Sequence, residues 1–525
     1  MFSFSISHPP AFANKVPIFS DKDLIFSARS LYDSSIKQQG AGSLEKYYLA
    51  IDIGASSGRH ILGHVQDGRI ILEEIHRFDN RQLRQNGHDC WDMKNLWNGI
   101  LEGLKACKRL GKIPETIGID TWAVDYVLLD RADKPVGDAV AYRDDRTKGA
   151  DGLVESLVSP EELYARTGIQ KQDFNTIYQL IALKQEHPEQ LEQAESLLMI
   201  PDYFHFLLTG VKRQEYTNAT STNLVNAEAK AWDMELIRRL GLPARLFGPL
   251  SMPGTMVGEF LPEIQAAVGF NAKVVLPATH DTGSAFLAVP ARDDRAVYLS
   301  SGTWSLLGVE NETPITTETS RLENFTNEGG AWYRFRYLKN IMGLWMIQSI
   351  RRELNGVAYV AGKENRTADG KNWSFTDLAQ AAREAEGFPS VVDVNDGVFL
   401  APDSMIEAVK NACAGTGQPV PESVGELMQC VYQSLARCYA SAIQSLSALT
   451  GTSYTSINIV GGGCQDGYLN QLTAKATGLP VYAGPIEGTA IGNLVVQMIA
   501  AGEFASLREA RNYIKLSFDI QEVQP

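Results

Sequence analysis

Residues 47–74 read YYLAIDIGASSGRHILGHVQDGRIILEE, and the fold prediction rests on this stretch. An apolar, β-branched run ends at Asp52, and small residues fill positions 54–58 before Arg59 and a second apolar run. The pair Asp67-Gly68 then separates that run from a third, a pattern typical of a hairpin turn. We therefore expect three strands, joined first by a small-residue turn and then by a hairpin.

The small-residue turn suits an anion, because several backbone N–H groups come together there without side-chain bulk. Asp52, at the end of the first strand, is placed to hold a hydrated Mg²⁺ beside a bound phosphate. The letters GASSG also match the nucleophile elbow of esterases, which requires a helix after the turn. Since the following run predicts a hairpin, we favour a nucleotide-phosphate site over a hydrolase.

Length and composition narrow the protein class. A chain of 525 residues is too long for one compact core, which predicts two domains. The net charge of −14, without a lysine- or arginine-rich run, argues against nucleic-acid and anionic-membrane partners. Six scattered cysteines without metal-ligand spacing, and no apolar stretch of membrane-spanning length, predict a cytoplasmic protein without a zinc site. Residues 1–45 lack the features of a signal peptide, and we expect a poorly ordered extension.

Later segments alternate between strand and helix patterns. Residues 296–310, AVYLSSGTWSLLGVE, repeat the strand–turn–strand logic of the opening, with Thr303 in the turn. Residues 93–111 have helical spacing, and Ser423 with Glu426 forms a capping-box pattern before a helix that runs to Gly451. Such alternation predicts an α/β fold with ligands at the carboxyl ends of the strands.

Three polar segments are candidates for chemistry. His280-Asp281-Thr282 follows the strand pattern KVVLPAT, so Asp281 can accept a hydroxyl proton in a cleft, although an Asp in a turn is more often a cap. A set of polar and aromatic residues suits a carbohydrate site or, alternatively, a surface salt-bridge cluster: Asp120, Thr121, Trp122 and Asp125, with Tyr142, Arg143, Asp144 and Arg146. Residues 215–226, EYTNATSTNLVN, predict a polar loop or edge.

A glycine-rich turn, GGGCQDG, occupies residues 461–467 between a strand pattern and a helix pattern. The dinucleotide-binding pattern fails there, since Asp466 stands at its third glycine. A nucleoside contact and a purely structural turn both stay open. The sequence contains no GxxxxGK[ST], which excludes a P-loop kinase or ATPase.

Read together, these segments resemble the FGGY carbohydrate kinases, over residues 46–510. The segments that carry the resemblance are IDIGASSGR, GIDTWAVDYVLLD, AYRDDRT, PDYFHFLLTG, EYTNATSTNLVN, THDTGSA, YLSSGTWSLLG, LKNIMGLW and IVGGGCQDGYLNQL. The resemblance implies two ribonuclease-H-like domains of the actin and hexokinase type, with ATP and sugar in the cleft between them. It places an N-terminal domain at 46–290, for sugar and phosphate, and a nucleotide-binding domain at 291–525.

The activity implied is transfer of the γ-phosphate of ATP, with Mg²⁺, to the 1-hydroxyl of a ketose, L-rhamnulose. Asp281 is then the general base. The resemblance also implies two sets of ligand contacts: the sugar contacts are Ala123, His280, Asp281, Thr282 and Asn340, and the nucleotide contacts are Ala55, Ser56, Ser57, Gly58, Arg59, Thr303, Gln348 and Gly462.

Position 123 departs from the family pattern, which has glycine where this chain has Ala123. The extra methyl group narrows the expected pocket, so a related ketose such as L-fuculose or L-xylulose is an alternative substrate. A non-catalytic ATP-dependent switch of the actin type is the alternative of a different class. Retention of Asp281 and of the polar sugar-site segments argues against that switch.

Overall fold

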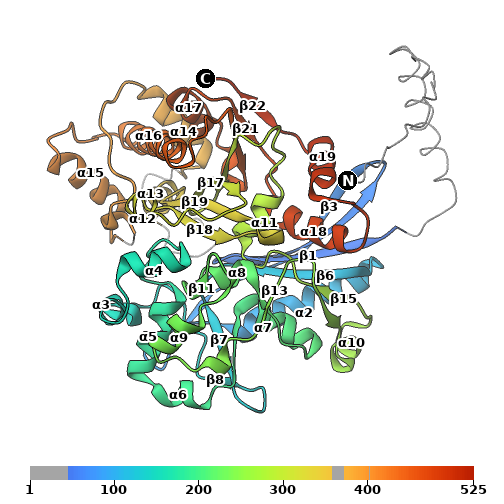
Figure 1. Ribbon diagram of the computed structural model, residues 1–525. Coiled ribbons are helices and arrows are strands. Elements are labelled where there is room, and N and C mark those ends of the chain that lie inside the picture. The colour runs from blue at the N-terminus through green and yellow to red at the C-terminus, as the bar shows by residue number, and fades with distance from the viewer. Residues whose placement is uncertain (1–44, 357–371, 401) are drawn as a thin grey trace, which may run out of the picture. The chain divides into compact units, whose positions relative to one another are not determined.

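Two large sheets organise the chain (Figure 1). The structure is a computed structural model that describes residues 45–356, 372–400 and 402–525. The predicted N-terminal extension therefore lies outside the described residues, apart from Glu45. The division into domains at residues 290 and 291 stays a prediction, because helices from both ranges pack between the sheets.

The first sheet has six strands, and its centre is the stretch that opens the sequence. Their spatial order is β14 (Met256–Glu259), β15 (Lys273–Val275), β6 (Pro114–Thr121), β1 (Tyr47–Ile53), β2 (Ser57–Gln66) and β3 (Arg69–Asp79). β1, β2 and β3 are antiparallel neighbours, and the β2–β3 hairpin turns at Asp67 and Gly68, which both have positive φ. The predicted meander is confirmed. A strand rather than a helix follows the small-residue turn, so the chain has no nucleophile elbow there.

The second sheet has seven strands and contains a similar unit. Their order is β18 (Thr326–Gly329), β19 (Phe335–Ile341), β17 (Ser305–Asn311), β16 (Ala296–Ser301), β20 (Ser456–Val460), β21 (Val481–Ala483) and β22 (Gln521–Val523). β16 pairs antiparallel with β17 and parallel with β20. The second strand–turn–strand unit predicted at 296–310 is therefore confirmed.

Each sheet has one face covered by helices from its own half of the chain. On the first sheet these are α2 (Met93–Leu110), α7 (Ile200–Thr209) and α10 (Pro262–Val268). On the second sheet they are α13 (Trp345–Leu354), α14 (Phe375–Glu384), α15 (Met405–Gly415), α16 (Val424–Thr450) and α17 (Gly467–Thr477). The predicted capping box of Ser423 and Glu426 begins α16, and Gly451, with φ of 67°, ends it. The helices predicted at 93–111 and before Gly451 are therefore both confirmed.

Helices from opposite halves of the chain cover the other two faces. α18 (Gly488–Ala500) and α19 (Leu507–Ser517) pack on Tyr48, Ala50 and Ile61 of the first sheet. α11 (Asp281–Leu287) packs through Phe286 on Tyr298 of the second sheet. α11 and α18 also contact each other, and Figure 1 shows both helices between the two sheets. The two halves are thus joined by exchanged helices.

The contact between α11 and α18 is very close at one point. A Cβ atom built on Gly492 of α18 would lie 1.8 Å from the backbone oxygen of Ser284 in α11. No side chain fits at that distance, so glycine is required there for the two helices to approach. Interiors are packed as densely as organic crystals and transmit such strain to their surroundings.

Polar groups of α18 are hydrogen-bonded into the first sheet. The Gln497 amide donates to the Leu49 carbonyl oxygen at 2.9 Å and to Asn493 Oδ1 at 2.6 Å. The Asn493 amide donates to the Gly118 carbonyl oxygen at 3.1 Å and to Asp120 Oδ2 at 2.5 Å. All of these side chains are buried. Because every amide hydrogen has an acceptor, the network fixes where α18 lies on the sheet.

Shorter elements fill the remainder of the described chain. Between β3 and β14 they are β4 (Gln82–Gln85), β5 (His88–Trp91), β7 (Tyr126–Leu129), β8 (Pro135–Val136), η1 (Asp145–Thr147), α3 (Ala150–Glu155), α4 (Pro160–Thr167), α5 (Thr176–Glu186), α6 (Pro188–Gln193), β9 (Ser196–Met199), β10 (Gln214–Glu215), α8 (Tyr216–Thr220), β11 (Val225–Asn226), β12 (Ala231–Trp232), α9 (Met234–Arg239), η2 (Ala244–Leu246) and β13 (Leu250–Ser251). In the second half they are α12 (Glu318–Leu322), η3 (Ala331–Tyr333), η4 (Gly397–Phe399) and η5 (Gly462–Gln465). Among all of the residues described, no helix has the length and apolar character needed to cross a bilayer.

The prediction of a polar loop or edge at 215–226 is wrong. Residues 216–220 form the short helix α8, and residues 215–225 are all buried. The threonine and asparagine side chains are compatible with burial because they hydrogen-bond inside the protein. Glu215 alone accepts bonds from the backbone and hydroxyl of Thr217 and from those of Thr279. Polar composition therefore gave the wrong exposure for this segment.

Replacing Gly492 with alanine tests the α11–α18 contact. Overpacking a core typically costs about 1–3 kcal/mol. Because the added methyl group would collide with backbone, we expect Gly492→Ala to lower the free energy of unfolding by about 3 kcal/mol or more. The control is Gly467→Ala at the start of α17, where an added Cβ meets nothing within 4 Å. Urea denaturation followed by circular dichroism measures both variants. Equal stability of the two would contradict the close contact.

Candidate active site

Asp281 is the first residue of α11, and its two carboxylate oxygens have different surroundings. Oδ1 accepts from the Thr282 backbone N–H at 2.6 Å and from the Thr282 hydroxyl at 3.2 Å, and His280 Nε2 lies 3.4 Å away. No described residue donates to Oδ2. The side chain is 32% exposed, so a ligand can approach it. Oδ2 is therefore the oxygen available to accept a proton.

Two more carboxylates lie near Asp281. Asp52 of β1 and Asp120 of β6 are register partners on the parallel strand pair. Burial, and then the charge of Asp52, raise the pKa of Asp120 well above its ordinary value. Burial also raises the pKa of Asp281, helped by Asp52 and opposed by His280. Three acidic groups thus converge where two strands end and α11 begins.

The expected sugar residues at 123 and 280–282 come from segments that lie side by side. Thr121, the last residue of β6, forms a parallel bridge with His280, and its N–H donates to the Thr279 carbonyl oxygen at 2.9 Å. Ala123 follows two residues later and is half-buried. Thr279, which directly precedes His280, donates two hydrogen bonds to the Glu215 carboxylate. The structure therefore brings these predicted residues together.

The loop that carries Ala123 is shaped by a buried carboxylate. Asp125 accepts hydrogen bonds from the indole N–H groups of Trp91 and Trp122 at 2.7 and 2.9 Å, and from Gln179 at 3.0 Å. Burial raises the pKa of Asp125 to about 6, although these donors oppose the shift. The alternative of a surface salt-bridge cluster is wrong for Asp125, which is 1% exposed.

Val124, in the same loop, has φ of 68°, a value that β-branched residues rarely adopt. Its N–H donates to the Ser221 hydroxyl at 3.2 Å, and its carbonyl oxygen accepts from Thr176 at 2.6 Å. Such strain persists only where the surroundings hold it, and it is frequent at ligand sites. The polar segments at 176–179 and 221 thus support the loop rather than line the surface.

The first predicted phosphate turn is open to ligands. Gly54 N–H donates to the Ser57 carbonyl oxygen at 2.9 Å, and the Asn80 amide closes the turn by donating to the Gly54 carbonyl oxygen. Ala55 and Ser56 are exposed, whereas Gly58 is buried. A phosphate could therefore reach the turn at Ala55 and Ser56.

Arg59, the neighbouring predicted phosphate contact, is held between two carboxylates. It donates to Asp52 Oδ2 at 2.7 Å and to Glu487 Oε2 at 2.5 Å. Glu487 directly precedes α18, so Arg59 joins β1 to the start of that helix. A nucleotide that used this guanidinium would compete with both carboxylates.

The second turn brings three predicted nucleotide residues together. The carbonyl oxygens of Gly302 and Thr303 accept from the N–H groups of Leu344 and Trp345, at the start of the helix that contains Gln348. The glycine-rich turn packs on the other side, where a Cβ on Gly461, which has φ of 88°, would lie 2.9 Å from the Ser301 oxygen. A Cβ on Gly462 would meet nothing within 4 Å.

This geometry separates the two interpretations of GGGCQDG. Gly461 and Gly463 are required for packing against Ser301, whereas Gly462 faces open space where a ligand can approach the backbone. The structural explanation thus applies to the flanking glycines, and the nucleotide contact stays a prediction for Gly462.

Asn340 and two residues that the sequence did not reveal lie in β18 and β19, the last two strands at one end of the second sheet. The Asn340 amide donates to Gln170 at 3.2 Å. Glu328 of β18 and Arg336 of β19 are both buried beside His280. Neither residue is among the predicted site residues, because charged residues in short strands usually face solvent. The available signal was Arg336 between Phe335 and Tyr337, a cation within an apolar strand.

The carboxylates fit a Mg²⁺ ion that arrives with a nucleotide. Asp120 Oδ1 is buried and has no hydrogen-bond partner among the residues that the structure describes, and Asp52 contacts Arg59 through Oδ2. Within the described ranges, no group of three or more His, Cys, Asp or Glu side chains forms a complete metal site. Mg²⁺ usually takes one or two carboxylates together with phosphate oxygens and water. The donor set suits that mode of binding.

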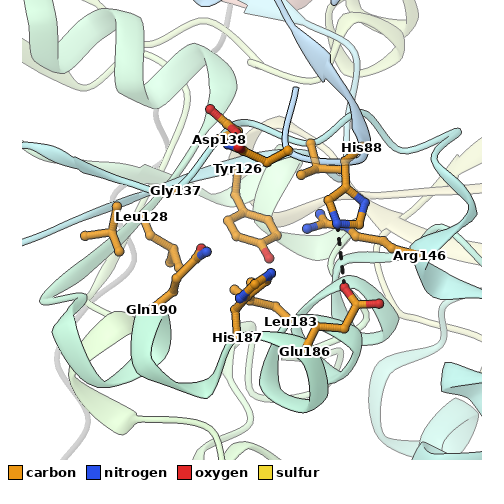
Figure 2. A pocket seen from close by; sticks show the side chains of 13 residues that line it. His88, Tyr126, Leu128, Gly137, Asp138, Arg146, Leu183, Glu186, His187 and Gln190 are labelled. Atoms are coloured by element: carbon orange, nitrogen blue, oxygen red, sulfur yellow. Dashed lines mark hydrogen bonds and ion pairs between the residues drawn. The ribbon is translucent and has the colours of Figure 1, made fainter. Parts of the chain in front are cut away.

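A separate cavity of about 250 Å³ lies away from these residues (Figure 2). Its walls come from β5, β7, β8 and the end of α5, and Figure 2 shows Tyr126, His88, Glu186 and Arg146 around it. Of the polar residues at 142–146, only Arg146 reaches this cavity. None of the residues predicted to contact sugar or nucleotide lines it.

Comparison with known proteins places both halves of the chain in one family. Residues 47–288 match the N-terminal domain of the FGGY family of carbohydrate kinases, and residues 297–501 match the C-terminal domain. The rhamnulokinase of Halalkalibacterium halodurans is 51% identical over 90% of this chain and 98% of its own length. The rhamnulokinase of Bacillus subtilis is 42% identical over 91% of this chain and 95% of its own length.

Solved structures show the same two-domain fold at low sequence identity. Gluconate kinase from Lactobacillus acidophilus matches with a TM-score of 0.72 and 17% identity, over 92% of this chain and 94% of that one. Glycerol kinase from Plasmodium falciparum, solved with ADP, has a TM-score of 0.69 and 14% identity, over 91% and 94% of the two chains. With both family domains matched in order, the chain belongs to the FGGY family of carbohydrate kinases.

Proposed function

We propose that this chain phosphorylates the 1-hydroxyl of L-rhamnulose with ATP, giving L-rhamnulose 1-phosphate in the degradation of L-rhamnose. The observation that carries the chemistry is the free Oδ2 of Asp281, whose partner oxygen is already held by Thr282 and approached by His280. The substrate is supported by the rhamnulokinases that match this chain at 40–51% identity over about 90% of its length.

Asp281 acts as the general base. Its Oδ2 accepts the proton of the sugar hydroxyl while that oxygen attacks the γ-phosphorus and the bond to ADP breaks. Phosphoryl transfer depends mainly on positioning and electrostatics, and correct orientation alone contributes roughly 7–11 kcal/mol. The hydrogen bonds on Oδ1 supply part of this orientation, because they fix the plane of the carboxylate.

The two small-residue turns hold the nucleotide. Backbone N–H groups near Ala55 and Ser56 approach the phosphates from the first sheet, and Thr303, Gln348 and Gly462 contact ATP from the second. Asp52 and Asp120 would hold Mg²⁺, which neutralises charge on the phosphoryl oxygens when it is bound. Arg59 then exchanges its carboxylate partners for phosphate.

Ala123, His280, Thr282 and Asn340 select the sugar. A site that hydrogen-bonds each sugar hydroxyl discriminates strongly between sugars, because a misplaced hydroxyl leaves buried polar groups without partners.

We place the reaction in the cytoplasm, since all six cysteines are free thiols, as expected in a reducing compartment.

The substrate is tested with an ADP-release assay on L-rhamnulose, L-fuculose and L-xylulose. We expect the highest kcat/KM for L-rhamnulose, by at least tenfold, because a mispaired hydroxyl is costly. Two-dimensional NMR of the product identifies the phosphorylated carbon, expected to be C1. A faster reaction with another ketose would overturn the substrate, and the absence of ADP release with any of them would revive the non-catalytic switch.

Replacing Asp281 with asparagine removes the base while it preserves the shape of the side chain. General-base catalysis contributes about 10²–10⁴-fold, so Asp281→Asn is expected to lower kcat by that factor. ATP binding, measured by calorimetry, should stay within about twofold of wild type. Asp145→Asn is the control, because that side chain is 80% exposed. Near-normal turnover of Asp281→Asn would exclude this residue as the base.

The pH dependence follows from the raised pKa of Asp281. The base works only when it is deprotonated, so kcat/KM should fall as pH decreases through that pKa, which lies above the ordinary 3.8. The Asp52 charge contributes to the shift, so Asp52→Asn should move the acid limb of the residual activity to lower pH. Asp145→Asn should leave the limb where it is. An unmoved limb in Asp52→Asn would contradict this coupling.

A further inference from the structure

Arg336 is a buried arginine that lies directly beside the predicted catalytic residues. It is 1% exposed on β19, and each of its three nitrogens has a neighbour. Nε donates to the Gly329 carbonyl oxygen at 3.0 Å, Nη1 lies 2.9 Å from Glu328 Oε2, and Nη2 lies 3.1 Å from His280 Nδ1. A buried charge is costly without a partner, and Glu328 supplies it.

The contact with His280 determines which ring nitrogen carries the proton. A guanidinium group has only N–H donors, so His280 Nδ1 must accept and cannot itself carry a hydrogen. A neutral imidazole with an unprotonated Nδ1 has its single proton on Nε2. The opposite tautomer would place two N–H groups face to face at 3.1 Å.

Glu328 does not overturn this assignment, although its Oε2 lies 3.3 Å from the same Nδ1. That oxygen is buried and takes part in no hydrogen bond of normal geometry with the described residues. The Arg336 charge, followed by His280, lowers the pKa of Glu328 to about 2 against the effect of burial. Glu328 is therefore the anion that neutralises Arg336, and as an anion it can only accept from Nδ1. Its Oε2 makes no hydrogen bond of normal geometry there, whereas Arg336 Nη2, a donor, contacts Nδ1 at 3.1 Å.

The other ring nitrogen faces the base. His280 Nε2 lies 3.4 Å from Asp281 Oδ1, the oxygen that already accepts from Thr282. With a proton on Nε2, the ring presents a donor to this carboxylate and to a sugar hydroxyl beside it. With the other tautomer, a lone pair would face the carboxylate and repel it.

We propose that Arg336, neutralised by Glu328, is a positioning residue that holds His280 in the Nε2–H tautomer, so that a donor faces Asp281 and the sugar. Arg336 belongs to the second sheet, whereas His280 precedes the helix that Asp281 begins. The tautomer is a property of the ligand-free chain, and only its kinetic consequence rests on the proposed function.

The tautomer is measured by long-range ¹H–¹⁵N correlation NMR on the full chain with ¹⁵N-labelled histidine. The His280 signals are assigned by their loss in His280→Gln. We expect a protonated Nε2 and an unprotonated Nδ1 in wild type, and a mixed or reversed tautomer in Arg336→Met. Arg334→Met, which removes an arginine with a 40% exposed side chain two residues away, should keep the wild-type pattern.

A double variant separates positioning from loss of folding. Arg336→Met alone leaves Glu328 buried without its counter-ion, so Arg336→Met/Glu328→Gln removes both charges together. We expect this protein to fold, by circular dichroism, and to lose the fixed tautomer. Arg336→Lys keeps a donor in place and should retain the tautomer at least in part.

The kinetic consequence is a loss of turnover without loss of nucleotide binding. We expect kcat with L-rhamnulose to fall about 10–100-fold in the double variant and less in Arg336→Lys, while the KM for ATP stays within twofold. A protonated Nδ1 in wild type, or an unchanged tautomer and kcat in the double variant, would overturn the inference. A fixed Nε2–H tautomer in a chain that turns over no ketose would instead count against the proposed function alone.

Discussion

The close contact between α11 and α18 is the constraint on which the arrangement of the site depends. Each helix comes from one half of the chain, and glycine at position 492 lets their backbones meet at Ser284. α11 begins with Asp281, and Glu487, directly before α18, binds Arg59. A shift of either helix would therefore move Asp281, the proposed base, relative to the first predicted phosphate turn. Packing of two backbones, rather than any single polar contact, sets this distance.

Buried polar networks then fix the neighbouring segments. Asn493 and Gln497 attach α18 to the first sheet, and Glu215 attaches the segment before His280 to α8. Asp125 attaches the loop that carries Ala123 to Trp91 and Gln179. These networks are fully buried, so breaking one partner leaves another group unsatisfied, at a cost of about 1–3 kcal/mol. The positions of the expected sugar residues thus depend on buried hydrogen bonds made by residues outside the site.

The candidate site contains more acidic than basic groups, which bears on the proposed binding of a nucleotide. Asp52, Asp120 and Asp281 converge near the Arg59 guanidinium, and burial raises the pKa of both Asp120 and Asp281. These carboxylates would repel a free phosphate, and a bound Mg²⁺ would offset that repulsion. The acidic cluster is therefore consistent with the proposal that the nucleotide binds together with Mg²⁺.

The sequence by itself determined the local elements and the family. The meander at 47–74, the second hairpin at 296–310 and the capping box at Ser423 depend on neighbouring residues, so their patterns were sufficient. The tertiary structure alone decided that 215–226 is buried, that Asp125 is a hub, and that Arg336 lies beside His280. Those facts depend on contacts between residues far apart in the chain, such as Trp91 with Asp125 and Arg336 with His280, which are 34 and 56 positions apart, and no local pattern records them. The sequence placed Asp281 at a strand end, but only the packing of two helices decided what surrounds it.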